Sequence, residues 1–542
     1  MLRPNFEIEE SEDVITEQIT HRLDDRETIT EVHGSDDRET ITEEEVKEAI
    51  NRLKNGKAAG HDNVKAEMIK TLGESGIKIL TAILNKAWNL GSIPTDWEVG
   101  IIILIFKKGN ARDCKNYRGI TLLSIASKVY ERVIESKLLK KTDKQMLDSQ
   151  SGFRKGYSTQ DHIFSIKEIT HKLLEQKQEA YIAFLDLEKA FDCISRKKIW
   201  CLLRERNVGK KITNAIESMY KVNQNYVRIH GMQSQEFNSE QGLRQGSVLS
   251  PILFNIVMDQ VMKESRERSK KLFIGYTNMQ RVGISECAFA DDLAIFANSQ
   301  KALQQNLDIW NSVLKSKNMK TNTEKSKVMV IAHDDLSTQV HIDGHTVEQV
   351  NEFKYLGCVL DSKGKHEIEV NERINAAAKL YHALNKSFIS KKEVSSQTKI
   401  KVFKTIFRPV LLWGSESWVL SKRLKSHIQA MEMKYLRRVK GVTRADKIRN
   451  DVIRSELEVE PALKIIEQNQ LKWFGHLQRL NDKRQVKKVW KTRTMPKRNR
   501  GRPIVTWNKM LEDILEQRGT TLQEARQLAQ DKKKWSKFVY DM

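Results

Sequence analysis

The chain has few of the residues that interrupt helices, cross-link a fold or span a membrane. Only seven of its 542 residues are proline, so long helices are permitted almost everywhere. Its five cysteines form no CxxC pair and lie beside no His-rich cluster, which argues against structural zinc and against a disulfide framework. The longest apolar run, IIILIF at 101–106, is too short to cross a bilayer, and the N-terminus lacks a secretion signal. We therefore expect a soluble intracellular protein that does not contact membranes.

Acidic residues are too few to balance the basic ones. The chain has 94 Lys and Arg against 71 Asp and Glu, a net charge of +23, which favours a polyanion as its large partner. The surplus is uneven, because residues 1–45 carry a net charge of −12 and residues 421–542 carry +17. We expect the acidic leader to be a disordered tail and the basic end to bind nucleic acid.

The leader ends in a sequence typical of a helix start. The octapeptide DDRETITE occurs at 24–31 and again at 36–43, a local duplication that is too short and polar for a solenoid. Its second copy runs into Thr42 and Glu45, which match a capping box, and apolar residues follow at helical spacing. The first ordered helix is predicted to begin there, after a leader of residues 1–43.

Three apolar stretches have the length and pattern of strands. They are VGIIILIF at 99–106, YIAFLDL at 181–187, and the pair CAFA and LAIFA, which flanks Asp291 and Asp292 and predicts a hairpin with two carboxylates at its turn. Helical segments separate these strands. The predicted fold class is therefore α+β.

The carboxylates at the strand ends need partners, because ionised groups beside apolar runs are costly to desolvate. If the two strands are neighbours in one sheet, Asp186 and Asp291 can converge on two divalent ions about 3.5–4 Å apart. Magnesium suits such an oxygen-only site, and manganese is an alternative. The other interpretation of Asp291 and Asp292 is an ordinary polar turn. The order of elements favours the metal site, because GLRQGSVLSP at 242–251 leads into a helix between the two strands.

Six motifs follow one another in a fixed order. They are NYRGITLLS at 116–124, QSGFRKGYST at 150–159, FLDLEKAFD at 184–192, QGLRQGSVLSPILFNI at 241–256, FADD at 289–292 and FKYLG at 353–357. With these motifs the chain resembles the reverse transcriptases of non-LTR retrotransposons (LINE elements), most closely the RTE group, over about residues 44–420.

The resemblance implies a right-hand polymerase. Fingers would span residues 44–180, the palm with its antiparallel sheet 181–365, a helical thumb 366–420, and a basic helical nucleic-acid-binding region 421–542. Apolar residues at helical spacing from Ile374 to Val410 also favour thumb helices.

The resemblance also assigns roles to the acidic residues and to one aromatic residue. Asp186 and Asp291 would be metal ligands, with Asp292 as an auxiliary catalytic carboxylate. Phe191 lies five residues beyond Asp186, where an aromatic ring would collide with a ribose 2′-hydroxyl and so select deoxynucleotides. A plain core position is the alternative for Phe191.

Further residues are expected around the nucleotide. The resemblance places Gln245 and Gly246 at the incoming nucleotide and template, in a loop whose glycine lets backbone approach a ligand. Arg118 and Lys107, together with the neighbouring Lys108, would supply charge to the triphosphate. Lys325 would protonate the departing pyrophosphate. A solvated surface charge is the alternative for each of these cations.

Phe353, Tyr355 and Gly357 match a hairpin that holds the primer. Packing of the same residues against the palm is a competing and compatible explanation.

The basic end contains a concentrated stretch of positive charge. Residues 483–502 hold ten basic and no acidic side chains, with Trp490 among them, and would add salt-sensitive affinity for phosphates. A nuclear-address signal or a disordered linker is the alternative. RGRP at 500–503 also resembles an AT-hook core, although similar RTE tails carry the same sequence before a tryptophan.

The first hypothesis is therefore an RNA-directed DNA polymerase that takes an RNA template, a DNA primer or target, and deoxynucleoside triphosphates. A catalytically silent, adopted nucleic-acid-binding remnant is the alternative, and a polymerase that makes RNA is a third, disfavoured by Phe191. KAAGHDNV at 57–64 departs from the proline-rich family sequence. We also expect no endonuclease, because the leader is too short to contain one, and nuclear localisation follows from the resemblance alone.

Overall fold

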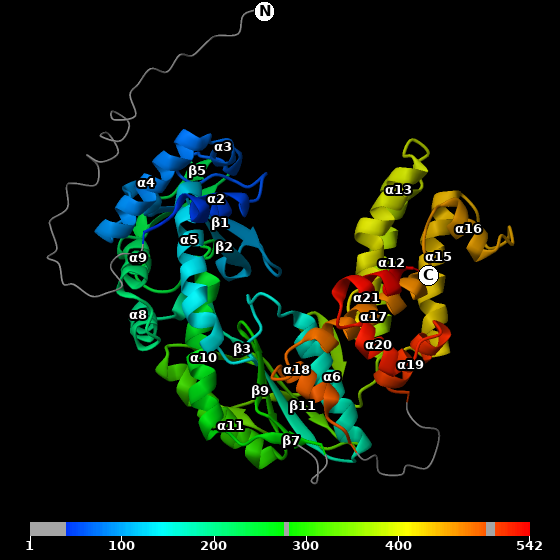
Figure 1. Ribbon diagram of the computed structural model, residues 1–542. Coiled ribbons are helices and arrows are strands. Elements are labelled where there is room, and N and C mark those ends of the chain that lie inside the picture. Colours follow the sequence, from blue (N-terminus) through cyan, green and yellow to red (C-terminus); the bar gives the residue numbers. More distant parts are fainter. Residues whose placement is uncertain (1–39, 276–280, 495–504, 542) are drawn as a thin grey trace, which may run out of the picture. The chain divides into compact units, whose positions relative to one another are not determined.

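The computed structural model describes residues 40–275, 281–494 and 505–541 (Figure 1). Nearly all of the predicted disordered leader, and the RGRP sequence at 500–503, lie outside the described residues. The chain divides into two compact units, with unit 1 comprising residues up to 147, 187–264 and 312–320, and unit 2 comprising 148–186, 265–311 and 321 onward.

Unit 1 contains a small mixed sheet. Strand β1 (Val99–Phe106) pairs with β2 (Tyr117–Leu122) in antiparallel fashion and with β4 (Gln224–Ile229) in parallel. Two short strands, β5 (Met232–Gln233) and β6 (Phe237–Asn238), pair with β4. The strand predicted at 99–106 is confirmed with the same bounds.

The first described helix begins where its capping box predicts. Helix α2 (Glu43–Asn51) has Thr42 as its N-cap; the Thr42 side chain accepts from the Glu45 amide, and the Glu45 carboxylate accepts from the Thr42 amide. The other helices of unit 1 are α3 (Ala66–Lys70), α4 (Glu74–Leu90), α5 (Ile125–Thr142), α7 (Ala190–Cys193), α8 (Arg196–Glu205), α9 (Lys210–Lys221) and the greater part of α10 (Ser250–Arg268).

Unit 2 is built on a five-stranded sheet. Its strands run in the order β14 (Glu348–Gln349), β11 (Thr321–Ile331), β3 (Ala180–Leu187), β10 (Asp292–Ala297) and β9 (Glu286–Phe289). The central strand β3 is buried at every position except Asp186, as expected for a strand covered on both faces. Strands β9 and β10 form the predicted hairpin, with Ala290 and Asp291 as its turn. The prediction of two carboxylates at the turn is wrong for Asp292, which is the first residue of β10 and pairs with Phe289.

Short strands and many helices complete unit 2. The strands are β7 (Leu272–Ile274), β8 (Val282–Ile284), β12 (His341–Ile342), β13 (His345–Thr346), β15 (Glu352–Tyr355) and β16 (Cys358–Asp361). The helices are α6 (Thr159–Glu175), most of α11 (Gln300–Ser316), α12 (Glu367–Leu384), α13 (Ser396–Val402), α14 (Arg408–Leu412), α15 (Lys422–Lys440), α16 (Asn450–Glu456), α17 (Ala462–Arg479), α18 (Gln485–Lys491), α19 (Trp507–Gln517), α20 (Leu522–Leu528) and α21 (Lys532–Tyr540). The α+β fold class is confirmed.

The hydrophobic cores of unit 2 join segments far apart in the sequence. One core runs from Val370 on α12 to Ile466 on α17, so apolar packing is continuous across residue 420. In another core, the ring of Phe164 on α6 lies 5.5 Å from Trp473 and 5.0 Å from Trp507. The boundaries of fingers, palm, thumb and C-terminal region stay predictions.

No helix among the described residues is both long and apolar enough to cross a membrane.

Candidate active site

Two of the predicted aspartates lie side by side on neighbouring strands. Strand β10 pairs with β3 so that Leu293 lies opposite Leu185, and the same register continued by one residue brings Asp292 opposite Asp186. Paired residues of antiparallel strands project to the same face, which alternates along the strand. Asp186 and Asp292 therefore share the face opposite to the two leucines, and Asp291 occupies the adjacent turn.

The three carboxylates repel one another when all of them are ionised. The pKa of Asp292 is raised to about 6, first by the surrounding protein, which removes part of its hydration, and then by the charges of Asp291 and Asp186. Solvent screens this effect in part, because Asp292 remains exposed. The mutual repulsion indicates a site that a cation would stabilise.

Lys325 supplies a positive charge beside this cluster. It lies on β11, which neighbours β3 in the sheet, and its Nζ is 3.3 Å from Oδ2 of Asp186. The Lys325 side chain is 65% exposed, so the ion pair contributes little to stability and the ammonium stays accessible. The structure thus brings Lys325 to Asp186, one of the predicted aspartates.

The donor chemistry fits a hard divalent cation, because carboxylate oxygens are the ligands that such ions prefer. In the described ranges, however, no group of three or more His, Cys, Asp or Glu side chains converges closely enough to hold a metal. Asp186 and Asp292 are therefore neighbours on one face of the sheet, and the roles of Asp186 and Asp291 as metal ligands stay predictions.

A segment of the second motif supports the aspartate hairpin from one side. The amide of Ser151 donates to the carbonyl of Ala288 (3.0 Å), and the amide of Ala288 donates to the carbonyl of Ser149 (2.9 Å). The segment therefore runs beside β9 like a short parallel strand.

Two residues of this segment fix the turn itself. The side-chain oxygen of Gln150 accepts from the amides of Ala290 (3.2 Å) and Gly152 (3.1 Å). Ala290 has a left-handed backbone (φ +58°), which needs such support. A Cβ on Gly152 would lie 2.4 Å from the Ala290 nitrogen, so only glycine fits. The sequence showed these residues as part of a motif but gave them no role.

A buried histidine packs beside the same hairpin. The ring of His162 on α6 lies 6.2 Å from that of Phe289, the last residue of β9. Burial lowers the pKa of His162 to about 4, partly opposed by Asp161. The folded protein therefore keeps His162 neutral under conditions in which an unfolded chain, with a pKa near 6.5, takes up a proton.

The free energy of unfolding is expected to decrease as the pH is lowered, because of His162. The loss begins as the pH drops below about 6.5 and is complete near pH 4, reaching about 3 kcal/mol at most from 1.36 kcal/mol per pKa unit. Chemical unfolding of the wild type and of His162→Gln at pH 7 and pH 4.5 measures the difference. The variant should lose less stability on acidification, and the exposed control His345→Gln should behave as the wild type; equal losses in all three would contradict this origin.

The predicted primer hairpin is anchored by aromatic packing. Strands β15 and β16 form an antiparallel pair, and the ring of Phe353 stacks on that of Phe184 at 4.3 Å. Tyr355 lies 5.3 Å from Phe184 and is buried, which raises the pKa of its hydroxyl. Gly357 (φ +83°) faces Trp413, where a Cβ would lie 3.2 Å from the indole ring. These contacts establish the packing role, and contact with a primer stays a prediction.

Phe191, in unit 1, is held in a defined orientation. Its ring stacks on that of Phe254 in α10 with centroids 4.3 Å apart and planes inclined by 8°. The residue is half-buried, so one part of the ring packs and another stays accessible. Both the gate and the core interpretations are compatible with this geometry.

Three of the predicted nucleotide contacts lie together in unit 1. Nε of Arg118 donates to the side-chain oxygen of Gln245 (3.1 Å), whose amide nitrogen donates to Asp192 (2.9 Å). The amide of Thr121 donates to the carbonyl of Gln245 (2.7 Å), and a Cβ on Gly246 would lie 2.1 Å from the Thr121 oxygen. Close backbone approach therefore requires the predicted glycine.

Lys107 lies just after the end of β1, and its backbone amide donates to the carbonyl of Asn116 (2.8 Å). Its side chain is exposed, as is that of Lys108. The structure thus leaves the proposed role of these two lysines as a prediction.

Part of the chain, including the three aspartates, matches a known protein family. Residues 105–360 match the family model described as "Reverse transcriptase (RNA-dependent DNA polymerase)". The matched segment makes up slightly under half of the chain.

The relatives are polymerases of non-LTR retrotransposons. The chain is 27% identical over 456 residues to the "Probable RNA-directed DNA polymerase from transposon X-element" of Drosophila melanogaster, covering 80% of this chain and 48% of that protein. It is 26% identical over 413 residues to the "RNA-directed DNA polymerase from mobile element jockey" of the same species, covering 73% and 44%. The chain spans about half the length of these curated relatives.

Among solved structures, the chain is similar to telomerase from Candida albicans in complex with a fragment of telomeric RNA. The two are 14% identical with a TM-score of 0.41, over 73% of this chain and 65% of that one.

Proposed function

We propose that this chain is an RNA-directed DNA polymerase of the non-LTR retrotransposon type, closest to the RTE group, which extends a primer 3′-hydroxyl on an RNA template. The observation that carries the proposal is the pairing of β3 with β10 inside a reverse transcriptase domain, which brings Asp186 and Asp292 together beside Asp291. The observed packing of unit 2 supports this arrangement of acidic residues.

The acidic residues would hold divalent cations. Asp186 and Asp291 are the proposed ligands of two magnesium ions, with manganese as an alternative, and Asp292 is the auxiliary carboxylate. When bound, such ions activate the primer hydroxyl and stabilise the leaving oxygen. In the transfer, the 3′-hydroxyl would lose its proton to water, its oxygen would bond to the α-phosphorus, and the bond between that phosphorus and the pyrophosphate oxygen would break.

Lys325 would act on the leaving group. Its exposed ammonium beside Asp186 can donate a proton to the departing pyrophosphate.

The residues of unit 1 would recognise the nucleotide. Arg118, oriented by Gln245, presents a guanidinium suited to phosphate oxygens, and Lys107 adds charge. Gly246 lets the backbone approach the nucleotide and template, and Phe191 would exclude the ribose 2′-hydroxyl. The substrates are then deoxynucleoside triphosphates.

The hairpin of β15 and β16 would hold the primer through Phe353, Tyr355 and Gly357. The basic residues of 421–542 would add phosphate contacts to the RNA template and DNA target. Action of the protein in the nucleus is part of the same proposal.

The proposal is tested by extending a labelled DNA primer on an RNA template with the purified chain. We expect incorporation of deoxynucleotides with magnesium or manganese and much weaker incorporation of ribonucleotides. Template binding without incorporation under either metal would favour a catalytically silent nucleic-acid-binding protein, and preferred incorporation of ribonucleotides would favour an RNA-making polymerase.

A further inference from the structure

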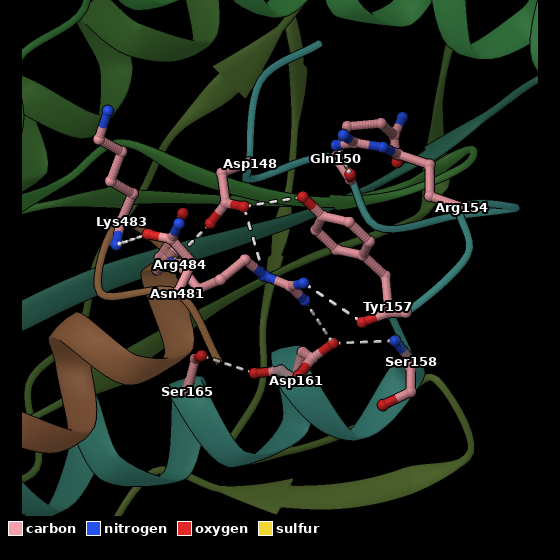
Figure 2. A network of polar contacts seen from close by, with 12 residues as sticks. Asp148, Gln150, Arg154, Tyr157, Ser158, Asp161, Ser165, Asn481, Lys483 and Arg484 are labelled. Carbon is pink, nitrogen blue, oxygen red and sulfur yellow. Dashed lines mark hydrogen bonds and ion pairs between the residues drawn. The ribbon is translucent and has the colours of Figure 1, made fainter. Parts of the chain in front are cut away.

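A segment of the basic C-terminal region is docked on the second motif. Arg484 lies between α17 and α18, and Figure 2 shows its guanidinium between two carboxylates. Its Nε is 3.3 Å from Asp148 and its Nη2 is 3.0 Å from Asp161. A third nitrogen donates to the carbonyl of Gly156 (3.2 Å), and the guanidinium carbon lies 3.4 Å from the centroid of the Tyr157 ring.

The contact with Asp161 is largely shielded from water, whereas the Asp148 side chain is 31% exposed. The Arg484 side chain is 12% exposed and that of Asp161 is 5% exposed. Charge-assisted hydrogen bonds in such surroundings are strong, and removing one partner leaves the other charge buried without compensation. The Arg484 side chain therefore contacts the loop of residues 148–158 and is not available to bind phosphate.

The next residue reaches the aspartate hairpin directly. The backbone amide of Gln485 donates to Asp148 (2.7 Å). Its side-chain amide donates to the carbonyl of Glu286 (3.2 Å) and to Sγ of Cys287 (3.2 Å), both on β9. One short segment thus contacts both the loop and the hairpin.

Further contacts connect this loop with the turn that contains Asp291. Nη1 of Arg154 donates to the carbonyl of Gln150 (2.9 Å), and its guanidinium lies 4.3 Å from the Tyr157 ring, which also contacts Arg484. Gln150 in turn accepts from the amide of Ala290, the residue before Asp291. The contacts are continuous from Arg484 to the turn.

We propose that Arg484 and Gln485 are positioning residues that fix the geometry of the Asp291 turn through the loop of residues 148–158. This inference rests on the proposed polymerase function. It assigns part of the basic C-terminal segment to the architecture of the acidic site.

The central test is Arg484→Gln in the full-length chain, with hydrogen exchange followed by mass spectrometry. Peptides covering residues 286–297 should exchange at least fivefold faster than in the wild type, whereas peptides of α15 should be unchanged. The magnesium concentration for half-maximal primer extension should rise about fivefold, and affinity for the RNA–DNA template–primer should stay within twofold. The matched control is Lys483→Gln, which removes the same charge from the exposed neighbouring residue and should alter none of these quantities.

If Arg484→Gln does not fold, two further variants allow the same exchange measurement. Gln485→Ala removes the contact with β9 but leaves Arg484, and Gly152→Ala perturbs the turn from the other side of the same contacts. Both should accelerate exchange in the same peptides.

Unchanged exchange across residues 286–297 in Arg484→Gln and Gln485→Ala would overturn the inference. A loss of nucleic-acid affinity with unchanged exchange would instead make Arg484 a phosphate contact and would also overturn it. Because exchange is measured without substrate, it reports on the positioning role even if the chain proves inactive as a polymerase.

Discussion

Replacement of Asp291 by asparagine is expected to lower the rate of deoxynucleotide incorporation by about three orders of magnitude, roughly 4 kcal/mol of transition-state stabilisation. Asparagine keeps the shape of the turn residue but removes one negative charge, so it weakens the proposed hold on both divalent ions. Single-turnover primer extension at saturating nucleotide measures this rate directly.

The expected loss is specific to the acidic cluster. Asp334→Asn, at an exposed position of unit 2, removes the same charge and should leave the rate unchanged. Thermal unfolding and template affinity should be alike in the wild type and both variants. If Asp291→Asn keeps more than a tenth of the wild-type rate, the role assigned to Asp291 is wrong.

Replacement of Phe191 by valine is expected to change which sugar the enzyme accepts. If the ring blocks the ribose 2′-hydroxyl, its removal should raise kcat/KM for ribonucleotides relative to the matching deoxynucleotides by about 10- to 100-fold, the usual range for a steric contact of this size. Parallel primer-extension assays with the two kinds of nucleotide measure the ratio.

The core interpretation of Phe191 predicts a different outcome. Loss of the stack on Phe254 would then destabilise the protein by about 1–3 kcal/mol while leaving sugar discrimination as it was. Phe237→Val, at an exposed aromatic position of unit 1, is the matched control and should change neither quantity. A destabilised variant with unchanged discrimination would remove Phe191 from the nucleotide site.

Strong local patterns in the sequence were sufficient to predict several elements. The apolar stretch at 99–106 became β1 with the same bounds, and the capping box at Thr42 begins α2. The hairpin around Asp291 was also predicted, because short apolar runs on both sides of a polar pair leave few other arrangements. These signals depend on neighbouring residues alone.

The contacts that shape the site depend on residues far apart in the chain. Arg484 pairs with Asp161, which is 323 positions away. Ten of the residues in 483–502 are basic, and the sequence does not indicate which of them lies between carboxylates. In the same run Trp490 is buried and the backbone of 485–491 is helical, neither of which its charge pattern indicates. The register that brings Asp292 opposite Asp186 is likewise a property of the folded sheet.

Direct measurement of metal binding tests the central claim most closely. Manganese binding, followed by electron paramagnetic resonance with a primer–template and a non-hydrolysable deoxynucleotide present, should reveal two ions on the wild type. Asp186→Asn and Asp291→Asn should each weaken binding at least tenfold, and Asp334→Asn should not. Manganese binding that is unchanged in both active-site variants would contradict an acidic metal site formed by β3 and the hairpin of β9 and β10.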